Sequence, residues 1–129
     1  MRRIAVLAFL VVLAACSDAT GPSGSVVGSY QLKTINGNPL PYSFSAYGGS
    51  SAVLESDVLT LNSDGTYSDV GQYSSAQGNT SITENGTWTN NNGSITFDDQ
   101  TDGIEYQGSV SGTVLTEIVD NYTEVYQKR

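Results

Sequence analysis

The sequence predicts an all-β fold, a small antiparallel up-and-down β-barrel of about eight or nine strands. Three observations support this prediction. Apolar and polar residues alternate with a period of two over short runs, turn-forming residues interrupt the runs about every eight to twelve positions, and no stretch has the periodicity of an ordinary helix. A meander of this size removes its exposed edges by closing into a barrel, and a two-sheet sandwich is the alternative.

The expected strands are short runs bounded by residues that form turns. Asn36-Gly37 ends the first strand, and Asn62-Ser63-Asp64-Gly65 ends the second. Pro39 and Pro41 make the segment after the first strand irregular or an edge, because proline cannot donate a hydrogen bond to a neighbouring strand. We expect strands at residues 27–36, 57–62, 66–74, 80–89, 94–98, 104–110, 113–119 and 122–127.

The N-terminal segment has the three parts of a secretory signal in the required order. Arg2 and Arg3 come first, an apolar run from Ile4 to Leu13 follows, and small residues precede a lone cysteine, Cys16. The apolar run is much shorter than the ~20 residues that a helix needs to cross a bilayer. We therefore expect residues 1–15 to be a cleaved signal peptide and not a permanent transmembrane helix.

The end of this signal indicates a lipid anchor. Leu13-Ala14-Ala15-Cys16 resembles the lipobox of bacterial lipoproteins, which implies cleavage before Cys16 and attachment of acyl chains, such as palmitate, to that residue. An ordinary secretory signal cut near Ala15 is the alternative. By resemblance to Gram-negative lipoproteins, Ser17 in place of aspartate implies the outer membrane. Residues 16–25 contain no large apolar side chain, so we expect a flexible tether before a single domain at residues 26–129.

The chain after the signal is acidic. Lys33, Lys128 and Arg129 are its basic residues, against all thirteen acidic residues of the sequence. Such a surface repels phosphate backbones, so nucleic acid is excluded as a partner. Neutral, cationic or metal-bearing partners remain, although acidity that only keeps an exported protein soluble explains the same composition.

The residue types that are absent restrict the chemistry. The chain has no histidine and one cysteine. Without histidine it cannot form a Ser-His-Asp triad or a histidine zinc site, and acylation of Cys16 removes the thiol. We therefore expect a protein that is not an enzyme and that has no metal or other cofactor. A glycosidase that acts through carboxylates alone ranks last among the functions considered.

Several short motifs resemble those of bacterial lipocalin-like domains. They are Val27-Gly28-Ser29-Tyr30-Gln31-Leu32, Asn36-Gly37 with Leu40-Pro41, Leu59-Thr60-Leu61 with Asp64-Gly65-Thr66-Tyr67, and Gly86-Thr87-Trp88. The resemblance covers nearly the whole of residues 26–129 and implies a calyx-like barrel that binds a small molecule. The layout also resembles the copper-resistance type of lipoprotein barrel, but that type has a Cys-x-x-Cys pair that this chain lacks.

Two predicted hairpins bring a pair of glutamates together. If Asp120-Asn121 is a two-residue loop, Val119 faces Tyr122 and Glu117 faces Glu124; if Ser111-Gly112 is another, Tyr106 faces Glu117. All of these side chains then share the more apolar face. Opposed like charges destabilise a sheet, so such a pair suggests a site for a cation or an amine. A longer loop at Asp120, or solvation at the barrel mouth, is the alternative explanation.

The aromatic residues complete the candidate site. Tyr30, Trp88 and Tyr106 offer flat apolar area with polar edges, which suits a filled core or a ligand cavity, and filling is the simpler expectation. The candidate ligand-binding residues are Tyr30, Trp88, Tyr106, Glu117 and Glu124. The leading hypothesis is a lipid-anchored envelope module that binds a small apolar or cationic molecule. A protein-interaction or enzyme-inhibitor module that acts through its loops is the alternative.

The acidic run Asp98-Asp99-Gln100-Thr101-Asp102-Gly103 looks like a calcium loop. An EF-hand, however, needs a glutamate at the twelfth position and two flanking helices, and Ser109 stands at that position. We therefore interpret the run as an Asp-rich turn between strands and predict no metal site there, with weak calcium binding as the alternative.

Overall fold

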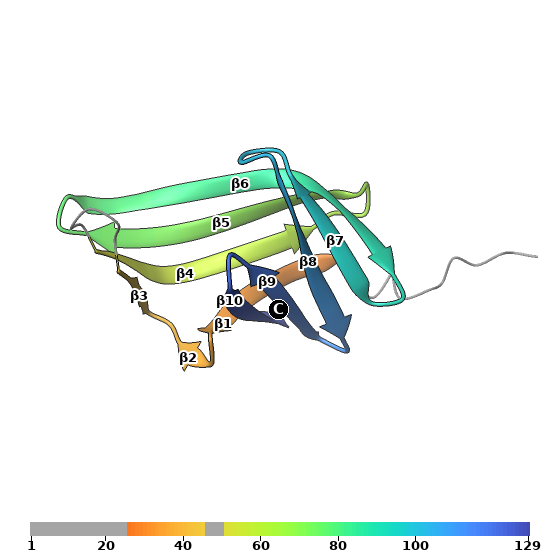
Figure 1. The fold of residues 1–129 in the computed structure, drawn as a ribbon, viewed down its shortest axis with the longest axis horizontal. Helices are drawn as coiled ribbons and strands as arrows, with labels where there is room; N and C mark the ends of the chain where they lie inside the picture. Colours follow the sequence, from red (N-terminus) through yellow and green to blue (C-terminus); the bar gives the residue numbers. More distant parts are fainter. Residues whose placement is uncertain (1–25, 46–50) are drawn as a thin grey trace, which may run out of the picture.

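The computed structural model describes residues 26–45 and 51–129, and these residues form β-strands joined by tight turns (Figure 1). No helix in this part of the chain has the length and apolar character needed to cross a bilayer. The strands are β1 (Gly28–Ile35), β2 (Asn38–Pro39), β3 (Tyr42–Phe44), β4 (Ala52–Leu61), β5 (Thr66–Ser75), β6 (Gly78–Asn91), β7 (Ser94–Asp99), β8 (Ile104–Ser111), β9 (Val114–Val119) and β10 (Tyr122–Lys128).

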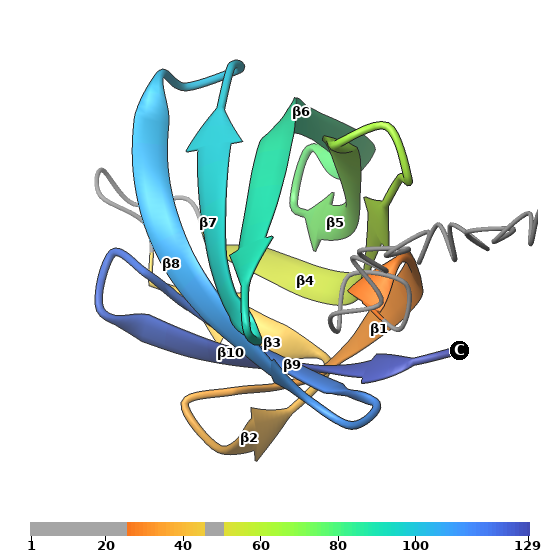
Figure 2. The same ribbon diagram turned by 90° about the vertical axis from the view of Figure 1, so that its right-hand side faces the viewer.

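Eight of these strands close into an antiparallel barrel, which confirms the predicted fold and rejects the sandwich. The hydrogen-bonded order runs from β1 through β10, β9, β8, β7, β6 and β5 to β4, and pairing of β1 with β4 closes the ring. Figure 2 shows the strands wrapped around a common axis. The short strands β2 and β3 pair with β1 and β4 respectively, outside the closed ring. β2 lies at an edge, as the prolines of this segment predict.

Tight turns fix the strand register, and one predicted turn is wrong by one residue, which shifts the pairing of its two strands by two residues. Asp120 and Asn121 both have positive φ (47° and 71°), which is the type I′ geometry of a two-residue loop, so Val119 pairs with Tyr122 as expected. The β8–β9 turn is centred on Gly112 and Thr113 instead of Ser111 and Gly112. Gly112 has φ of 60°, which a type II′ turn needs at its first central position. Glu117 consequently faces Gly108 and not Tyr106.

The turns alternate between the two ends of the barrel because neighbouring strands are antiparallel. The β4–β5, β6–β7 and β8–β9 turns lie at one end, which we call the packed end, and the β5–β6, β7–β8 and β9–β10 turns lie at the open end. The interior of the packed end is filled by side chains that are at most 8 % exposed: Tyr30, Leu59, Leu61, Tyr67, Trp88, Ile95, Phe97 and Leu115.

β6 is the strand that shapes the open end. It pairs with β5 from Gly78 to Thr87, but with β7 only from Gly86 to Asn91. Its first half therefore runs past the end of β7 and has no partner strand on that side among residues 26–45 and 51–129. Figure 1 shows β4, β5 and β6 as long ribbons that lie side by side and extend beyond the shorter strands β7 to β10.

Candidate functional site

A cavity of about 160 Å³ occupies the open end of the barrel. It has room for a few water molecules or a short alkyl amine, at ~30 Å³ per water. None of the described residues that line it is basic. Its acidic lining residues come from six segments: Asp57 on β4, Asp69 on β5, Glu84 on β6, Asp99 and Asp102 at the β7–β8 turn, Glu117 on β9 with Asp120 after it, and Glu124 on β10.

Two pairs of carboxylates lie directly opposite each other across neighbouring strands. Glu117 pairs with Glu124 between β9 and β10, and Asp69 pairs with Glu84 between β5 and β6. Directly opposed like charges cost stability in a sheet. The barrel holds both pairs in one cavity, so the open end concentrates negative charge that the packed end lacks.

Asp57 joins this set because of an irregularity in β4. The β4–β5 register shifts between Leu54 and Ser56, as at a β-bulge, so the inward alternation restarts one residue later. Leu54 and Asp57, three residues apart, both point inward as a result, and Asp57 is 7 % exposed.

Two buried carboxylate oxygens lack a hydrogen-bond partner among the described residues. They are Oε1 of Glu117 and Oδ1 of Asp69. Glu117 is 1 % exposed, so water outside the barrel does not reach it freely. A buried polar atom without a partner costs free energy unless an ion, a water molecule or a ligand satisfies it.

Burial and mutual repulsion raise the pKa values of these acids. Burial raises the pKa of Glu117 well above its ordinary value, and the charges of Glu124, Asp57 and Glu84 add to the rise. Burial likewise raises the pKa of Glu124, to about 7. A hydrogen bond donated by the Tyr126 hydroxyl group opposes this rise, and the negative charges of Asp57 and Glu84 add to it. Burial also raises the pKa of Asp69 well above its ordinary value, and a hydrogen bond with Asp57 and the charge of Asp57 add to the rise. Burial therefore favours the protonated form of these three carboxyl groups.

Tyrosines provide hydrogen-bonding groups around the acids. The Tyr126 hydroxyl group lies 3.1 Å from Oε2 of Glu124 and 3.5 Å from Oδ1 of Asp57, so it joins strands β10 and β4 across the interior. The Tyr106 hydroxyl group donates to that of Tyr67 at 3.3 Å. Phe97 stacks on Tyr106 with ring centroids 4.8 Å apart, which forms the apolar floor between cavity and packed end.

Inward-facing glycines leave the space that the acids occupy. A Cβ atom at Gly71 would lie 2.7 Å from the Tyr73 ring and 3.2 Å from Oδ2 of Asp57. At Gly108, opposite Glu117, it would lie 2.9 Å from a backbone oxygen and 3.4 Å from Cγ of Glu117. Larger residues at these positions would displace the tyrosine or the glutamate.

A shallower hollow adjoins the cavity. It has a volume of about 350 Å³ and shares Phe44, Tyr73 and Ile82 with the cavity, and Ala52 adds to its apolar wall. Charged groups and apolar surface therefore meet at the open end.

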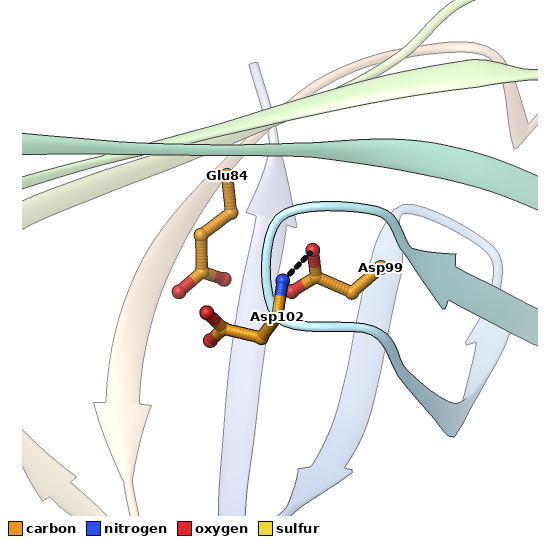
Figure 3. Close-up of side chains that lie close together, drawn as sticks. All are labelled: Glu84, Asp99 and Asp102. Atoms are coloured by element: carbon orange, nitrogen blue, oxygen red, sulfur yellow. Dashed lines mark hydrogen bonds between the residues drawn. The ribbon is translucent and has the colours of Figure 1, made fainter.

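Three of the acids form a compact cluster at the rim. Glu84, Asp99 and Asp102 each place a carboxylate oxygen so that all three oxygens lie within 4.8 Å of one another (Figure 3). Oδ1 of Asp99 accepts hydrogen bonds from the backbone N–H groups of Thr101 (2.7 Å) and Asp102 (3.3 Å), which fix the turn. Three convergent carboxylate oxygens are the donor type that hard cations such as Ca²⁺ prefer.

A comparison with protein families matches residues 56–123 to the NlpE N-terminal domain. The match covers just over half of the chain, from β4 to the start of β10, and includes every cavity carboxylate except Glu124. The chain belongs to the NlpE N-terminal domain family. Searches of curated proteins and of solved structures found no match.

Membership of the NlpE family makes this chain a barrel module of the bacterial cell envelope. The family match thus confirms two expectations, a lipoprotein-type barrel and a location in the cell envelope. The more specific resemblance to lipocalin-like domains, the outer membrane and the acylation of Cys16 stay predictions. The signal peptide, Cys16 and the tether fall in residues 1–25, outside the described residues.

The structure of this NlpE-family barrel separates the predicted site residues into two groups. Tyr106, Glu117 and Glu124 all line the cavity, and the predicted pairing of the two glutamates is confirmed. Tyr30 and Trp88 lie elsewhere, in the packed end. The hydroxyl group of Tyr30, a fully buried residue, bonds to the Val26 carbonyl, and Nε1 of Trp88 donates to two backbone carbonyls near the β4–β5 turn.

Asp57, Asp69 and Glu84 also line the cavity and are not among the site residues predicted from the sequence. A signal for two of them was present, because Asp69 alternates with Tyr67 and Tyr73 along one strand, and Glu84 has the same parity as Trp88 along the next. The predicted turn between strands is confirmed for residues 100–103 only, because Asp98 and Asp99 are the last residues of β7. Asp99 points into the barrel and is 1 % exposed.

Proposed function

We propose that this NlpE-family domain is an envelope module, held at the outer membrane by acyl chains on Cys16, that binds a small organic cation in its acidic cavity without acting as an enzyme. The observation that most supports the proposal is Glu117, a carboxylate 1 % exposed whose Oε1 has no partner among the described residues. It faces a second glutamate in a cavity that no basic side chain lines. An ammonium group there would form charge-assisted hydrogen bonds with groups that otherwise repel one another.

The surroundings of the carboxylates favour an organic ammonium group over an anion or a purely apolar molecule. An anion would meet acids from six segments of the barrel. An apolar molecule would leave the buried oxygens of Glu117 and Asp69 without partners, which binding energy would have to offset. A short amine places its charge among the acids and its carbon chain against the hollow lined by Phe44 and Ile82.

The test is calorimetric titration of the full chain, in neutral detergent, with spermidine as a linear polyamine and succinate as a dicarboxylate of opposite charge. We expect spermidine to bind and succinate not to bind. Glu117→Gln should weaken spermidine binding at least tenfold, since each tenfold corresponds to ~1.4 kcal/mol and charge-assisted hydrogen bonds are worth about that much.

Glu105→Gln is the matched control. Glu105 lies on the exposed face of β8, so this variant removes the same charge without touching the cavity. Equal loss of affinity in both variants would show that only the overall charge of the protein attracts spermidine. Absence of binding by the unmodified chain would reject the proposal.

The anchor is tested separately in cells. Cys16→Ser should abolish incorporation of a labelled fatty acid and leave the signal peptide uncleaved, because the cysteine of the lipobox is the residue that is acylated in the bacterial lipoproteins that this segment resembles. Undiminished labelling of the Cys16→Ser variant would reject lipidation at this residue without affecting the proposal on ligand binding.

A protein-contact role is the second candidate function, and one observation favours it. Ile118 is 61 % exposed and Ile104 is 39 % exposed, and both line a hollow formed by β8 and the end of β9. Exposed apolar side chains that gather in one place are typical of protein contact surfaces. Loss of a copurifying protein in Ile118→Ser, with spermidine binding intact, would favour this role.

A further inference from the structure

The rim cluster of Glu84, Asp99 and Asp102 is formed where two features of the barrel meet. β6 continues past the end of β7, which leaves Glu84 without a partner on that side, two residues beyond the last β6–β7 pair at Gly86. The β7–β8 turn folds into this gap and is held there by Asn85, whose carbonyl accepts from the N–H of Gln100 at 3.0 Å and whose N–H donates to Oγ1 of Thr101 at 2.9 Å. The turn thereby brings Asp99 and Asp102 to Glu84 (Figure 3).

A second observation, independent of the cluster, points to a cation at this end of the barrel. Asp69, the direct cross-strand neighbour of Glu84, has a buried Oδ1 with no partner among the described residues. Glu117 lines the same cavity, is 1 % exposed and has an unpartnered Oε1. Among the described residues that line the cavity, the tyrosine hydroxyl groups are the only side-chain donors besides the acids themselves. Few groups of the protein could therefore satisfy these oxygens.

The chemistry of the cluster selects the type of cation. All three side chains offer carboxylate oxygens, whereas copper and other softer metals favour sulfur and imidazole ligands, which this site does not contain. Calcium takes six to eight oxygen ligands at ~2.3–2.6 Å in flexible geometry, so neighbouring ligand oxygens can lie several ångströms apart. Magnesium demands a tighter octahedron and keeps more of its water.

We propose that Glu84, Asp99 and Asp102 form a calcium-binding site at the open end of the barrel, separate from the amine-binding role proposed for the glutamate pair. Bound calcium would tie the first half of β6 to the β7–β8 turn and so close the wall where β7 is missing. The ligand set spans residues 84 to 102, unlike an EF-hand, whose ligands lie within one 12-residue loop.

The experiment is calorimetric titration of the full chain, in neutral detergent, with calcium chloride and, in parallel, with magnesium chloride. We expect saturable binding of one calcium ion per chain, with magnesium at least tenfold weaker. Asp102→Asn should weaken calcium binding at least tenfold because it removes a ligand charge. Asp102 is exposed, and the hydrogen bond that it donates to Asp99 comes from its backbone, so the variant keeps the turn.

Asp98→Asn is the matched control, since Asp98 is an exposed aspartate next to Asp99 on β7 but lies outside both the cluster and the cavity lining. Its calcium affinity should stay within twofold of that of the unmodified chain. No saturable calcium binding, or equal losses in the two variants, would overturn the proposal. A chain that binds spermidine but not calcium would reject this site alone, and one that binds calcium but not spermidine would reject only the proposed amine binding.

Discussion

The two ends of the barrel use the same inward positions for opposite purposes. At the packed end these positions hold tyrosines, leucines and a tryptophan that exclude water, and at the open end they hold carboxylates and glycines that keep a cavity. β5 shows the change within one strand, because its inward residues pass from Tyr67 to Asp69 to Gly71. The packed end therefore stabilises a fold whose other end gives up stability for an acidic interior.

The largest effect should come from the floor between the two ends. Phe97 is fully buried, stacked on Tyr106 and in edge contact with Tyr67 at 5.2 Å. Phe97→Ala should lower the free energy of unfolding by about 3–5 kcal/mol, the usual cost of deleting a buried phenylalanine ring. Urea denaturation measures the change. Phe44→Ala, at a half-buried position of the open end, is the matched control and should cost clearly less.

A change of opposite sign is expected at the open end. Glu124 has a folded-state pKa of about 7 against an ordinary value of 4.5, so folding binds protons between those values, and this contribution to stability is lost as pH rises from about 4.5 to about 7. Asp57 and Glu84 raise this pKa, and Tyr126 lowers it. Glu124→Gln should therefore stabilise the unliganded barrel by about 1–3 kcal/mol at pH 8.

Thermal unfolding from pH 4 to pH 8 measures this difference between Glu124→Gln and the unmodified chain. The two melting curves should converge toward pH 4, where the glutamate is protonated in both the folded and the unfolded state. Equal melting temperatures at every pH would show that the carboxylates are independently solvated and that the open end stores no electrostatic strain.

A smaller effect should follow from Trp88 at the packed end. Its Nε1 donates to the carbonyls of Asn62 at 3.1 Å and Thr66 at 3.0 Å. Trp88→Phe should cost about 1 kcal/mol, because both carbonyls also accept backbone hydrogen bonds and are not left without a partner. Chemical denaturation measures it, and a loss above about 3 kcal/mol would indicate that the ring itself, not the hydrogen bonds, is the main contribution.

The smallest effect is expected on the outer surface, which belongs to neither interior. Ile118 is 61 % exposed, so Ile118→Ser should change the free energy of unfolding by less than about 0.5 kcal/mol. The same denaturation experiment provides the value. A larger loss would mean that the hollow beside Ile104 contributes to folding.

The strand register next to a tight turn could be predicted from the sequence, because it depends on a few neighbouring residues. The pairing of Glu117 with Glu124 follows from counting outward from the Asp120-Asn121 loop, because a two-residue hairpin fixes the register of the strands on both sides. The β8–β9 turn was predicted one residue too early, which shifts the strand pairing by two residues, because a glycine can occupy either central position depending on the turn type. A two-residue shift in pairing leaves each side chain on the same face of the sheet, so the side chains predicted to point inward still do so.

The rest of the site depends on contacts that are distant in the sequence. Asp57 faces inward because of an irregularity near Ser56, and its strand meets β1 only when the barrel closes. Glu84 reaches Asp99 and Asp102 because β7 stops short of the first half of β6. Strand lengths and barrel closure are properties of the whole fold, and alternating hydrophobicity does not determine them.

Both ends of the barrel domain lie at the end of the barrel opposite the cavity mouth. β1 starts and β10 ends at the packed end, where the N–H of Arg129 donates to the carbonyl of Ser29 at 3.0 Å. If residues before Val26 tether the protein as predicted, the point of attachment lies at the packed end, and the mouth of the barrel lies at the opposite end. A fluorescent label added after Arg129 would likewise lie at the packed end and leave the mouth clear.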